Sequence, residues 1–325
     1  MRSKRLLVVS GVAAISLAAA AATAGPALAA SPPVSHVHIV AHFDIATGQQ
    51  PENIALERDG APDVTFAFAH QIARVTRGGV QVLATLPAPP AGSAVPVLGA
   101  PEFLAGIVVA SDGTRFVNYN TGTAALTGVW RVRPGGRPVR IAALPADSLA
   151  NGLAIDRDTG MLYVTDSALG VIWRVPVSGG TPVVWASGPD LQSAGFLGAN
   201  GLKVHDGAVW ASNTDKGLLL RIPILPGGAA GTIQIAASGV TAIDDFSFTS
   251  AVGDTVLAAQ NAISQVALIL PDGTHTTVLT AADGLSNPSS VAVTGHTIYV
   301  TSAAYVTGKD PNLLTAQLAC SVPTW

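Results

Sequence analysis

The sequence predicts an all-β fold, a six-bladed β-propeller of four-stranded blades, on three observations. A short apolar run with alternating side chains recurs six times behind a polar or small residue, at intervals of 44 to 53 residues. Each repeat contains several strand-like runs separated by turns, and a repeat of this length is typical of a propeller blade. After residue 29, no segment sustains the 3.6-residue period of an amphipathic helix. The residues that precede the six runs are Glu52, Ala105, Asn151, Asn200, Asp244 and Ser289.

The strands of a blade follow one another in the same order in each repeat. In the third repeat, residues 151–155 alternate as an innermost strand requires, with one face against the next blade. An Asp-Thr-Gly turn leads to a second run at residues 162–166, and a third run follows at residues 171–175. The clearest outer strand is in the first repeat, at residues 82–86, after a Gly-Gly turn. Four strands per repeat are therefore expected.

The chain ends predict how the ring closes. The last repeat has a first run at residues 291–293, a second at 298–302 and a third near 313–318, and then the chain stops. Residues 37–43, ahead of the first repeat, resemble the outer-strand residues 80–86. We therefore expect the N-terminal strand to supply the outer strand of the sixth blade, which removes an exposed sheet edge.

The N-terminus has the pattern of an export signal. Three cations within the first five residues precede an uncharged Leu/Val/Ala run at residues 6–24, and Ala-Leu-Ala at residues 27–29 matches a cleavage site. The pattern predicts a signal peptide at residues 1–29, a propeller domain at residues 30–325 and a secreted protein with no membrane association after signal removal. A retained membrane anchor is the alternative interpretation.

Composition narrows the class of partner. The net charge is −3 and the 17 Lys and Arg residues are scattered, so there is no basic stripe to neutralise phosphates and a nucleic-acid partner is not expected. The single cysteine, Cys320, excludes an intramolecular disulfide and is interpreted as a bystander thiol. We expect a monomer that acts on a small molecule.

The six residues at the starts of the inner strands carry the chemistry. In a propeller these strands surround one central channel, so residues far apart in sequence converge there. Four of the six have side-chain oxygens that suit a hard cation, and Ca²⁺ is the cation that such ligands favour. These are Glu52, Asn151, Asn200 and Asp244. The alternative is that Asn and Asp simply begin strands after turns.

The same motifs resemble a known family. Pro-Glu-Asn-Ile-Ala at residues 51–55, Asn-Gly-Leu at 151–153 and at 200–202, and Asp-Asp-Phe at 244–246 are similar to the metal-ring motifs of the regucalcin (senescence-marker-protein)/gluconolactonase family of six-bladed propellers. Their placement in four blades is also similar to that in paraoxonase-type lactonases. The resemblance covers essentially the whole mature chain.

The resemblance implies a site and an activity. A divalent cation, usually calcium, would bind the same four residues, with Asp245 and Ser289 as further candidates for ligands or supports of ligands. The reaction would be hydrolysis of a lactone or related ester, in which the cation polarises the carbonyl and Asp244 deprotonates the attacking water.

The sequence also departs from these families. Gluconolactonase-like members contact a sugar lactone through an Arg, and neither Arg115 nor Arg140 lies in a matching motif. Paraoxonase-like members use a His near the metal, whereas the histidines at positions 205, 275 and 296 fall in turns. Apolar residues lie beside the six strand-start residues instead, which would permit apolar ligands; the alternative is that they only pack one blade on the next. They are Phe103, Ala105, Phe246 and Phe248.

Two other functional classes remain open. A non-catalytic propeller could use the ion to rigidify its channel and its loops to bind a partner. A saturated ion beneath a plugged channel would favour this scaffold, whereas an open coordination position facing a cavity would favour the hydrolase. A strictosidine-synthase-like propeller would use a catalytic Glu without metal, and the intact Glu-Asn-Asn-Asp set counts against it.

Overall fold

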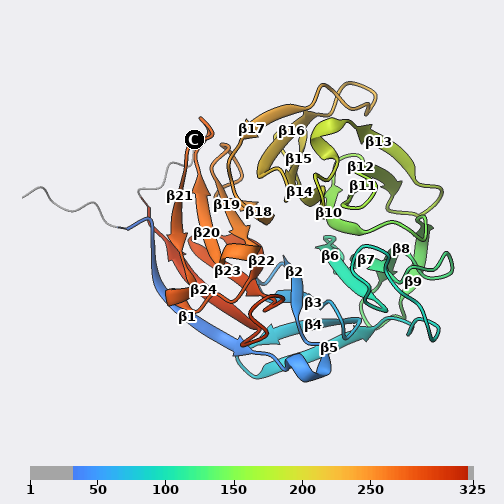
Figure 1. Cartoon of the computed structure of the whole chain (residues 1–325), viewed down its shortest axis with the longest axis horizontal. Coiled ribbons are helices and arrows are strands. Elements are labelled where there is room, and N and C mark those ends of the chain that lie inside the picture. Colours follow the sequence, from blue (N-terminus) through green and yellow to red (C-terminus); the bar gives the residue numbers. More distant parts are fainter. Residues whose placement is uncertain (1–31, 321–325) are drawn as a thin grey trace, which may run out of the picture. The chain divides into compact units, whose positions relative to one another are not determined.

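The computed structural model describes residues 32–320, which form six four-stranded antiparallel sheets arranged in chain order around a common centre (Figure 1). Only short 3-10 helices accompany the strands in this part of the chain. The predicted all-β, six-bladed propeller is therefore confirmed. The expected signal peptide at residues 1–29 lies outside the described residues.

The first three blades each consist of four consecutive strands. Blade 1 contains β2 (Pro51–Leu56), β3 (Pro62–Phe66), β4 (Gln71–Thr76) and β5 (Gly79–Thr85). Blade 2 contains β6 (Phe103–Val109), β7 (Arg115–Asn120), β8 (Gly128–Val132) and β9 (Val139–Ala143). Blade 3 contains β10 (Ala150–Asp156), β11 (Met161–Asp166), β12 (Val171–Pro176) and β13 (Val183–Ser187).

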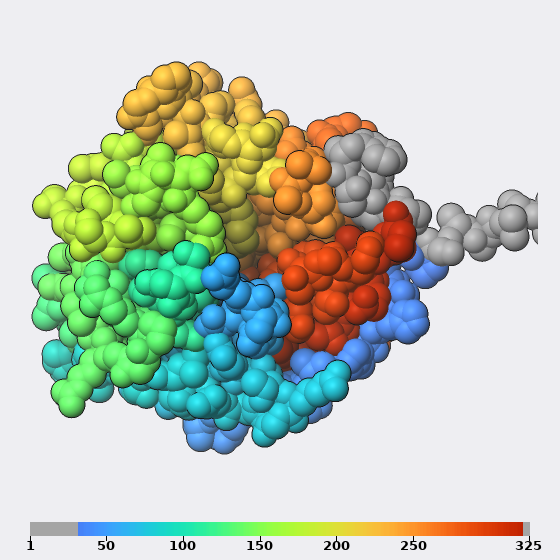
Figure 2. Space-filling view, turned by 180° about the vertical axis from the view of Figure 1, so that it is seen from behind, coloured from blue at the N-terminus to red at the C-terminus, as the bar shows by residue number. Residues whose placement is uncertain are grey.

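The next two blades follow the same plan. Blade 4 contains β14 (Ala199–His205), β15 (Ala208–Asn213), β16 (Leu218–Pro223) and β17 (Gln234–Ala237). Blade 5 contains β18 (Ile243–Phe248), β19 (Val256–Gln260), β20 (Gln265–Ile269) and β21 (His275–Leu279). Seen from behind, the differently coloured blades meet around the centre of the ring (Figure 2).

Blade 6 joins the two ends of the propeller. Its inner strands are β22 (Pro288–Thr294), β23 (Thr297–Ser302) and β24 (Asn312–Leu318), and its outer strand is β1 (Val34–His42). The register of β1 on β24 runs from Val34 opposite Leu318 to His42 opposite Asn312. The predicted closure by the N-terminal strand is therefore confirmed.

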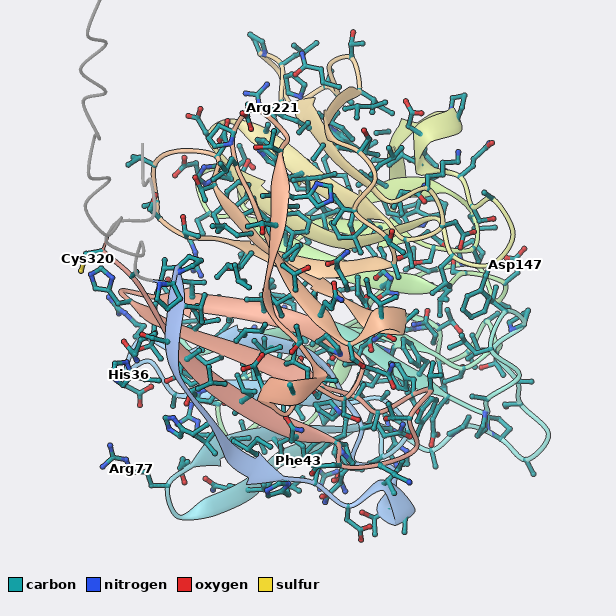
Figure 3. All side chains as sticks on the ribbon, turned by 60° about the vertical axis from the view of Figure 1, so that its left-hand side comes forward. His36, Phe43, Arg77, Asp147, Arg221 and Cys320 are labelled. Atoms are coloured by element: carbon teal, nitrogen blue, oxygen red, sulfur yellow. The ribbon has the colours of Figure 1, made fainter. Side chains whose placement is uncertain are left out.

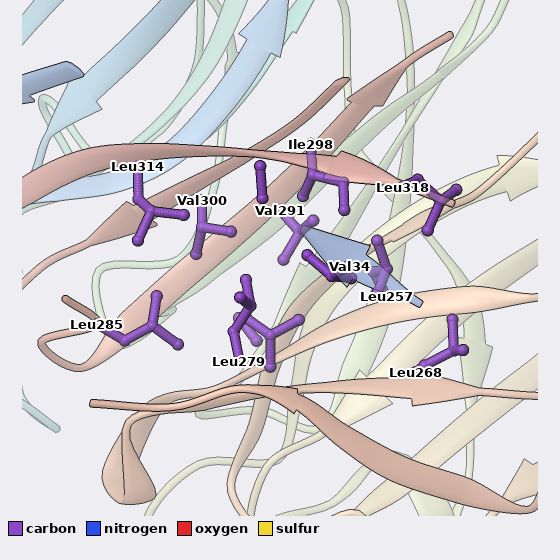
Figure 4. Close-up of a cluster of buried hydrophobic side chains, with 13 residues drawn as sticks. Val34, Leu257, Leu268, Leu279, Leu285, Val291, Ile298, Val300, Leu314 and Leu318 are labelled. Carbon is purple, nitrogen blue, oxygen red and sulfur yellow. The ribbon is translucent and has the colours of Figure 1, made fainter. Parts of the chain in front are cut away.

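The blades are held together by apolar side chains between their faces. One cluster fills the space between blades 5 and 6 and includes Leu257 and Val266 from blade 5, Val291 and Leu314 from blade 6, and Val34 from β1 (Figure 4). Burial of one such side chain contributes roughly 1.5–3 kcal/mol relative to exposure. The alternating pattern that predicted the strands thus reflects packing of each blade on its neighbour.

Cys320 follows β24 and is exposed at the outer edge of the fold (Figure 3). Between residues 32 and 320, no helix has both the length and the apolar character needed to cross a membrane.

A candidate metal centre in the channel

The six residues near the starts of the inner strands are called the ring residues below, and each lies in a β-bulge. They are Glu52, Ala105, Asn151, Asn200, Asp244 and Ser289. In blade 3, Ala150 pairs with Asp166 and Leu153 with Val164, so Asn151 and Gly152 together face the single residue Thr165. The first two strands of the other five blades show a register shift at the same place. A bulge redirects side chains out of the regular alternation. All six inner strands share this irregularity, and four of the six ring residues line the cavity described below.

Glycine follows the ring residue in three blades because adjacent inner strands approach closely there. A Cβ atom on Gly106, Gly152 or Gly201 would lie less than 3.0 Å from backbone atoms of the next blade. Gly152, for example, faces the Asn200 carbonyl and the Leu202 amide. In the Asn-Gly motifs, therefore, Asn faces the channel and Gly allows the next blade to pack.

Hydrogen bonds between neighbouring blades fix the backbone of the ring. In four blades, a polar side chain of the second strand donates to the carbonyl of the next blade's ring residue: Thr65 to Ala105, Asn118 to Asn151, Thr165 to Asn200 and Ser212 to Asp244. Blade 6 is joined to blade 1 by a different bond, in which Ser289 Oγ donates to the Pro51 carbonyl at 2.6 Å. These bonds engage the ring carbonyls and hold the side chains in their direction.

The four predicted cation ligands lie together in the structure. They come from blades 1, 3, 4 and 5, and all line one cavity of about 520 Å³. These residues are Glu52, Asn151, Asn200 and Asp244. All four are almost completely buried. Their convergence is the geometric requirement for a shared ion.

Glu52 is a buried acid with one hydrogen-bond partner. The Tyr305 hydroxyl donates to its Oε2 at 2.5 Å. Burial raises the pKa of Glu52 to about 8; the Tyr305 hydrogen bond opposes the rise and the charge of Asp245 adds to it. Among residues 32–320, no basic side chain lines this cavity.

Asp244 is the second acid of the cavity. Burial raises the pKa of Asp244 well above its usual range, and the charges of Glu52 and Asp245 raise it further. Hydrogen bonds from Asn200 and Asn261 oppose the shift, and Asn261 Nδ2 donates to Asp244 Oδ2 at 3.1 Å. Ionising two buried carboxyl groups that repel each other is costly. A divalent cation bound between them would offset that cost.

The two asparagines complete the set of oxygen donors. Asn200 donates from Nδ2 to Thr214 Oγ1 at 2.9 Å, which identifies Oδ1 as the atom left for a cation. Asn151 is 3% exposed and lines the same cavity. A buried amide beside two acids can supply its oxygen to an oxygen-ligated ion such as Ca²⁺.

Asp245 and Ser289 lie beside the cavity and do not line it. The Asp245 carboxylate accepts hydrogen bonds from Lys203 at 2.6 and 2.8 Å, from Asn53 at 3.0 Å and from Ser290 at 2.6 Å. It therefore ties blades 1, 4 and 6 to blade 5. Ser289 joins blade 6 to blade 1, as described above. In this structure both residues are placed as supports of the ring.

Among the described residues that line the cavity there is no His or Cys, the side chains that transition metals prefer. In the described part of the chain, no three His, Cys, Asp or Glu side chains are grouped so that they could hold a metal ion. The set at the channel consists of two carboxylates and two amides, which is a hard, oxygen-only set.

Sequence reasoning missed several residues of the cavity. Asn261, in a short 3-10 helix after β19, and Tyr305, in the loop after β23, contact the two acids. Phe68, Leu98 and Phe196 also line the cavity, and Phe103 does so as expected. All but Phe103 lie outside strands, where no repeat pattern marks them.

The other residues considered from the sequence lie elsewhere. Arg115 is buried against Glu57 and Asp63, and His205 stacks on Phe248 with ring centroids 3.7 Å apart. Phe246 belongs to the core between blades 4 and 5. Arg140, His275 and His296 are not among the lining residues.

Comparison with known proteins rests on the fold alone. No family model and no curated protein matches this sequence. A gluconolactonase from Xanthomonas campestris is 14% identical, with a TM-score of 0.61 over 89% of this chain and 97% of that chain. A virginiamycin B lyase from Staphylococcus aureus, in a catalytically inactive histidine-to-alanine form with quinupristin, is 15% identical, with a TM-score of 0.58 over 84% and 82%. The PQQ-bound aldose sugar dehydrogenase from Streptomyces coelicolor is 16% identical, with a TM-score of 0.61 over 89% and 99%.

Proposed function

We propose that this chain is a secreted, divalent-cation-dependent hydrolase of a lactone or related ester. One observation carries the proposal: four oxygen-bearing side chains from four blades line a single cavity large enough for a substrate, about 520 Å³. The signal-like N-terminus supports export, and the absence of a basic stripe supports a small-molecule substrate. We further propose that the protein acts as a monomer.

The cation site would consist of Glu52, Asn151, Asn200 and Asp244. The buried, mutually repelling acids and the Asn151 amide that lines the same cavity support this assignment, and Ca²⁺ fits the all-oxygen set. Such an ion, when bound, keeps both carboxylates ionised and polarises the carbonyl oxygen of an ester.

Asp244 is the residue proposed to accept a proton from the attacking water. Asn261 holds its carboxylate from one side through Oδ2, and the carboxylate faces the cavity. As the water oxygen bonds to the carbonyl carbon, its proton passes to Asp244, and the ring or ester C–O bond then breaks with the proton returned to the leaving alkoxide.

Lyase chemistry like that of virginiamycin B lyase is less well supported. That neighbour is inactive when a histidine is replaced by alanine. In the described part of this chain, no histidine lines the cavity. A hydrolase that uses a carboxylate base is the better match to the side chains present.

A non-catalytic propeller with a structural ion is the second candidate. The observation in its favour is the hydrogen bond from Tyr305 to Glu52, which engages one ligand oxygen from within the fold. The open cavity beside the same residues favours the hydrolase.

The test combines metal analysis with a substrate panel. Purified mature protein should contain a divalent cation, hydrolyse at least one member of a panel of aldonolactones, aliphatic lactones and aryl esters, and lose that activity on chelation. Asp244→Asn should abolish turnover, whereas Asp272→Asn, at an exposed turn, should keep it. Bound metal without turnover on any member of the panel would favour the structural-ion alternative.

A further inference from the structure

One wall of the cavity is aromatic. Phe68 of blade 1, Phe103 of blade 2 and Tyr305 of blade 6 lie in mutual contact, with ring centroids 5.8, 5.9 and 6.3 Å apart. Because the Tyr305 hydroxyl also bonds Glu52, this wall begins directly beside an acid of the candidate cation site. Ala105, a ring residue without a polar side chain, is buried in the same apolar cluster.

The apolar surface continues to the rim of the cavity. Leu98, Leu149 and Leu197 line it, and Phe196 and Val306 do so while 55% and 74% exposed. A single exposed apolar residue needs no explanation, but two at the rim of an apolar-walled cavity extend one surface.

Side-chain oxygens of Asp215 and Asn287 hold the backbone of both rim residues in place. The Asp215 carboxylate accepts from the backbone amides of Ala194, Phe196 and Leu197 at 2.8, 2.7 and 3.1 Å. The Asn287 side-chain oxygen accepts from the amides of Val306 and Thr307 at 2.9 and 2.8 Å. The rim is therefore pre-organised, which lowers the cost of binding an apolar group.

The charged groups restrict the ligand further. Glu52 and Asp244 are the only charged side chains among the described residues that line the cavity, and one divalent cation would balance them. The one polar group of the aromatic wall, the Tyr305 hydroxyl, already donates to Glu52. The polar lining residues Gln50, Thr214 and Asn261 also donate hydrogen bonds within the protein, and a buried substrate hydroxyl without a partner is costly. A neutral substrate with an apolar substituent avoids that cost.

We propose that the substrate carries an uncharged alkyl or aryl group next to its ester or lactone carbonyl, and that this group packs on Phe68, Phe103 and Tyr305 and extends between Phe196 and Val306. The inference rests on the hydrolase function proposed above. It assigns the cavity to apolar esters or lactones and excludes polyhydroxylated sugar lactones as the preferred class.

The test is a series of γ-butyrolactones whose alkyl substituent, on the α-carbon next to the carbonyl, grows by one methylene at a time, with δ-gluconolactone as the polar comparison. In calcium, kcat/KM should rise about threefold to fourfold per methylene over the first few members, as expected for burial of each group. It should exceed the value for δ-gluconolactone. A kcat/KM that does not depend on chain length, or that is highest for the sugar lactone, would overturn the proposal.

Variants at the rim test whether Phe196 and Val306 cause the dependence of kcat/KM on alkyl-chain length. Phe196→Ser and Val306→Ser change exposed side chains and should fold; each should reduce the ratio of long-chain to short-chain kcat/KM by about fivefold to tenfold. Val252→Ser, which alters a residue of similar exposure away from the cavity, should leave the ratio unchanged. Equal ratios in all three variants would count against the assigned wall.

Failure of the hydrolase function can be distinguished from failure of this inference. If the wild-type protein hydrolyses nothing, binding of the neutral fluorescent probe N-phenyl-1-naphthylamine is measured in calcium. Saturable binding that is weakened by Phe196→Ser and Val306→Ser but not by Val252→Ser would support the apolar site without turnover. Absence of saturable binding would overturn the site together with the substrate class.

Discussion

The Tyr305 hydroxyl, in the loop after the second strand of blade 6, donates a hydrogen bond of 2.5 Å to Glu52 of blade 1, although 253 residues separate the two in sequence. This bond joins the blade that closes the ring to the proposed cation site. It also places an aromatic ring between the acid and the apolar wall. One side chain thereby orients a proposed ligand and forms part of the proposed substrate surface.

Tyr305→Phe should weaken calcium binding about tenfold, because partners that orient a ligand carboxylate commonly contribute 10- to 100-fold to metal affinity. Isothermal titration calorimetry on metal-free protein measures the change. Tyr299→Phe, on β23 of the same blade, is the matched control and should bind calcium as the wild type does. Equal affinities for Tyr305→Phe and wild type would remove the orienting role.

Glu52→Gln and Asp244→Ala should abolish the dependence of melting temperature on calcium. A ligand that binds only the folded state at 100 times its Kd stabilises that state by about 2.7 kcal/mol, and this gain requires an intact site. Differential scanning fluorimetry with calcium and with chelator measures it. If the wild-type melting temperature is the same in both conditions, the cation site is wrong.

The stability of the metal-free protein should fall as pH rises from about 5 to 8. Burial raises the pKa of Glu52 from 4.5 to about 8, so in this range the folded chain binds a proton that the unfolded chain has released. The unfolded state gains relative stability with each increase in pH, and the raised pKa of Asp244 acts with the same sign.

Urea unfolding between pH 5 and 9 tests this sign. Saturating calcium should remove most of the slope, because the cation displaces the proton, and calcium affinity should itself increase with pH. Glu52→Gln should flatten the metal-free profile. A metal-free profile that rises through this range would contradict the assignment.

Asp245→Ala should destabilise the fold by about 3 kcal/mol, with or without calcium. The substitution leaves the Lys203 ammonium without its carboxylate and the Asn53 amide and Ser290 hydroxyl without their acceptor in a buried position. Chemical denaturation in calcium and in chelator measures the loss, with Asp272→Ala at an exposed turn as control. A loss seen only in calcium would instead make Asp245 a ligand.

Strand positions were readable from the sequence because they depend on short-range pattern. The predicted run at residues 37–43 is β1 (Val34–His42), and the run near 313–318 is β24 (Asn312–Leu318). Residues 82–86 correspond to β5 (Gly79–Thr85), so both of these outer strands begin three residues before the predicted run. Ends move by a few residues because the hydrogen-bond ladder, and not side-chain alternation, sets where a strand stops.

The six-bladed architecture, its closure by the first strand and the four side chains that line one cavity could be predicted from the sequence. These features follow from repeat spacing and alternation, which every blade carries locally. The bulges at the ring residues, the role of Asp245 in joining blades, and the contribution of Asn261, Tyr305 and the aromatic wall to the cavity became visible in the folded chain. Those contacts arise between blades and from aperiodic loops, so they exist only once the ring has closed.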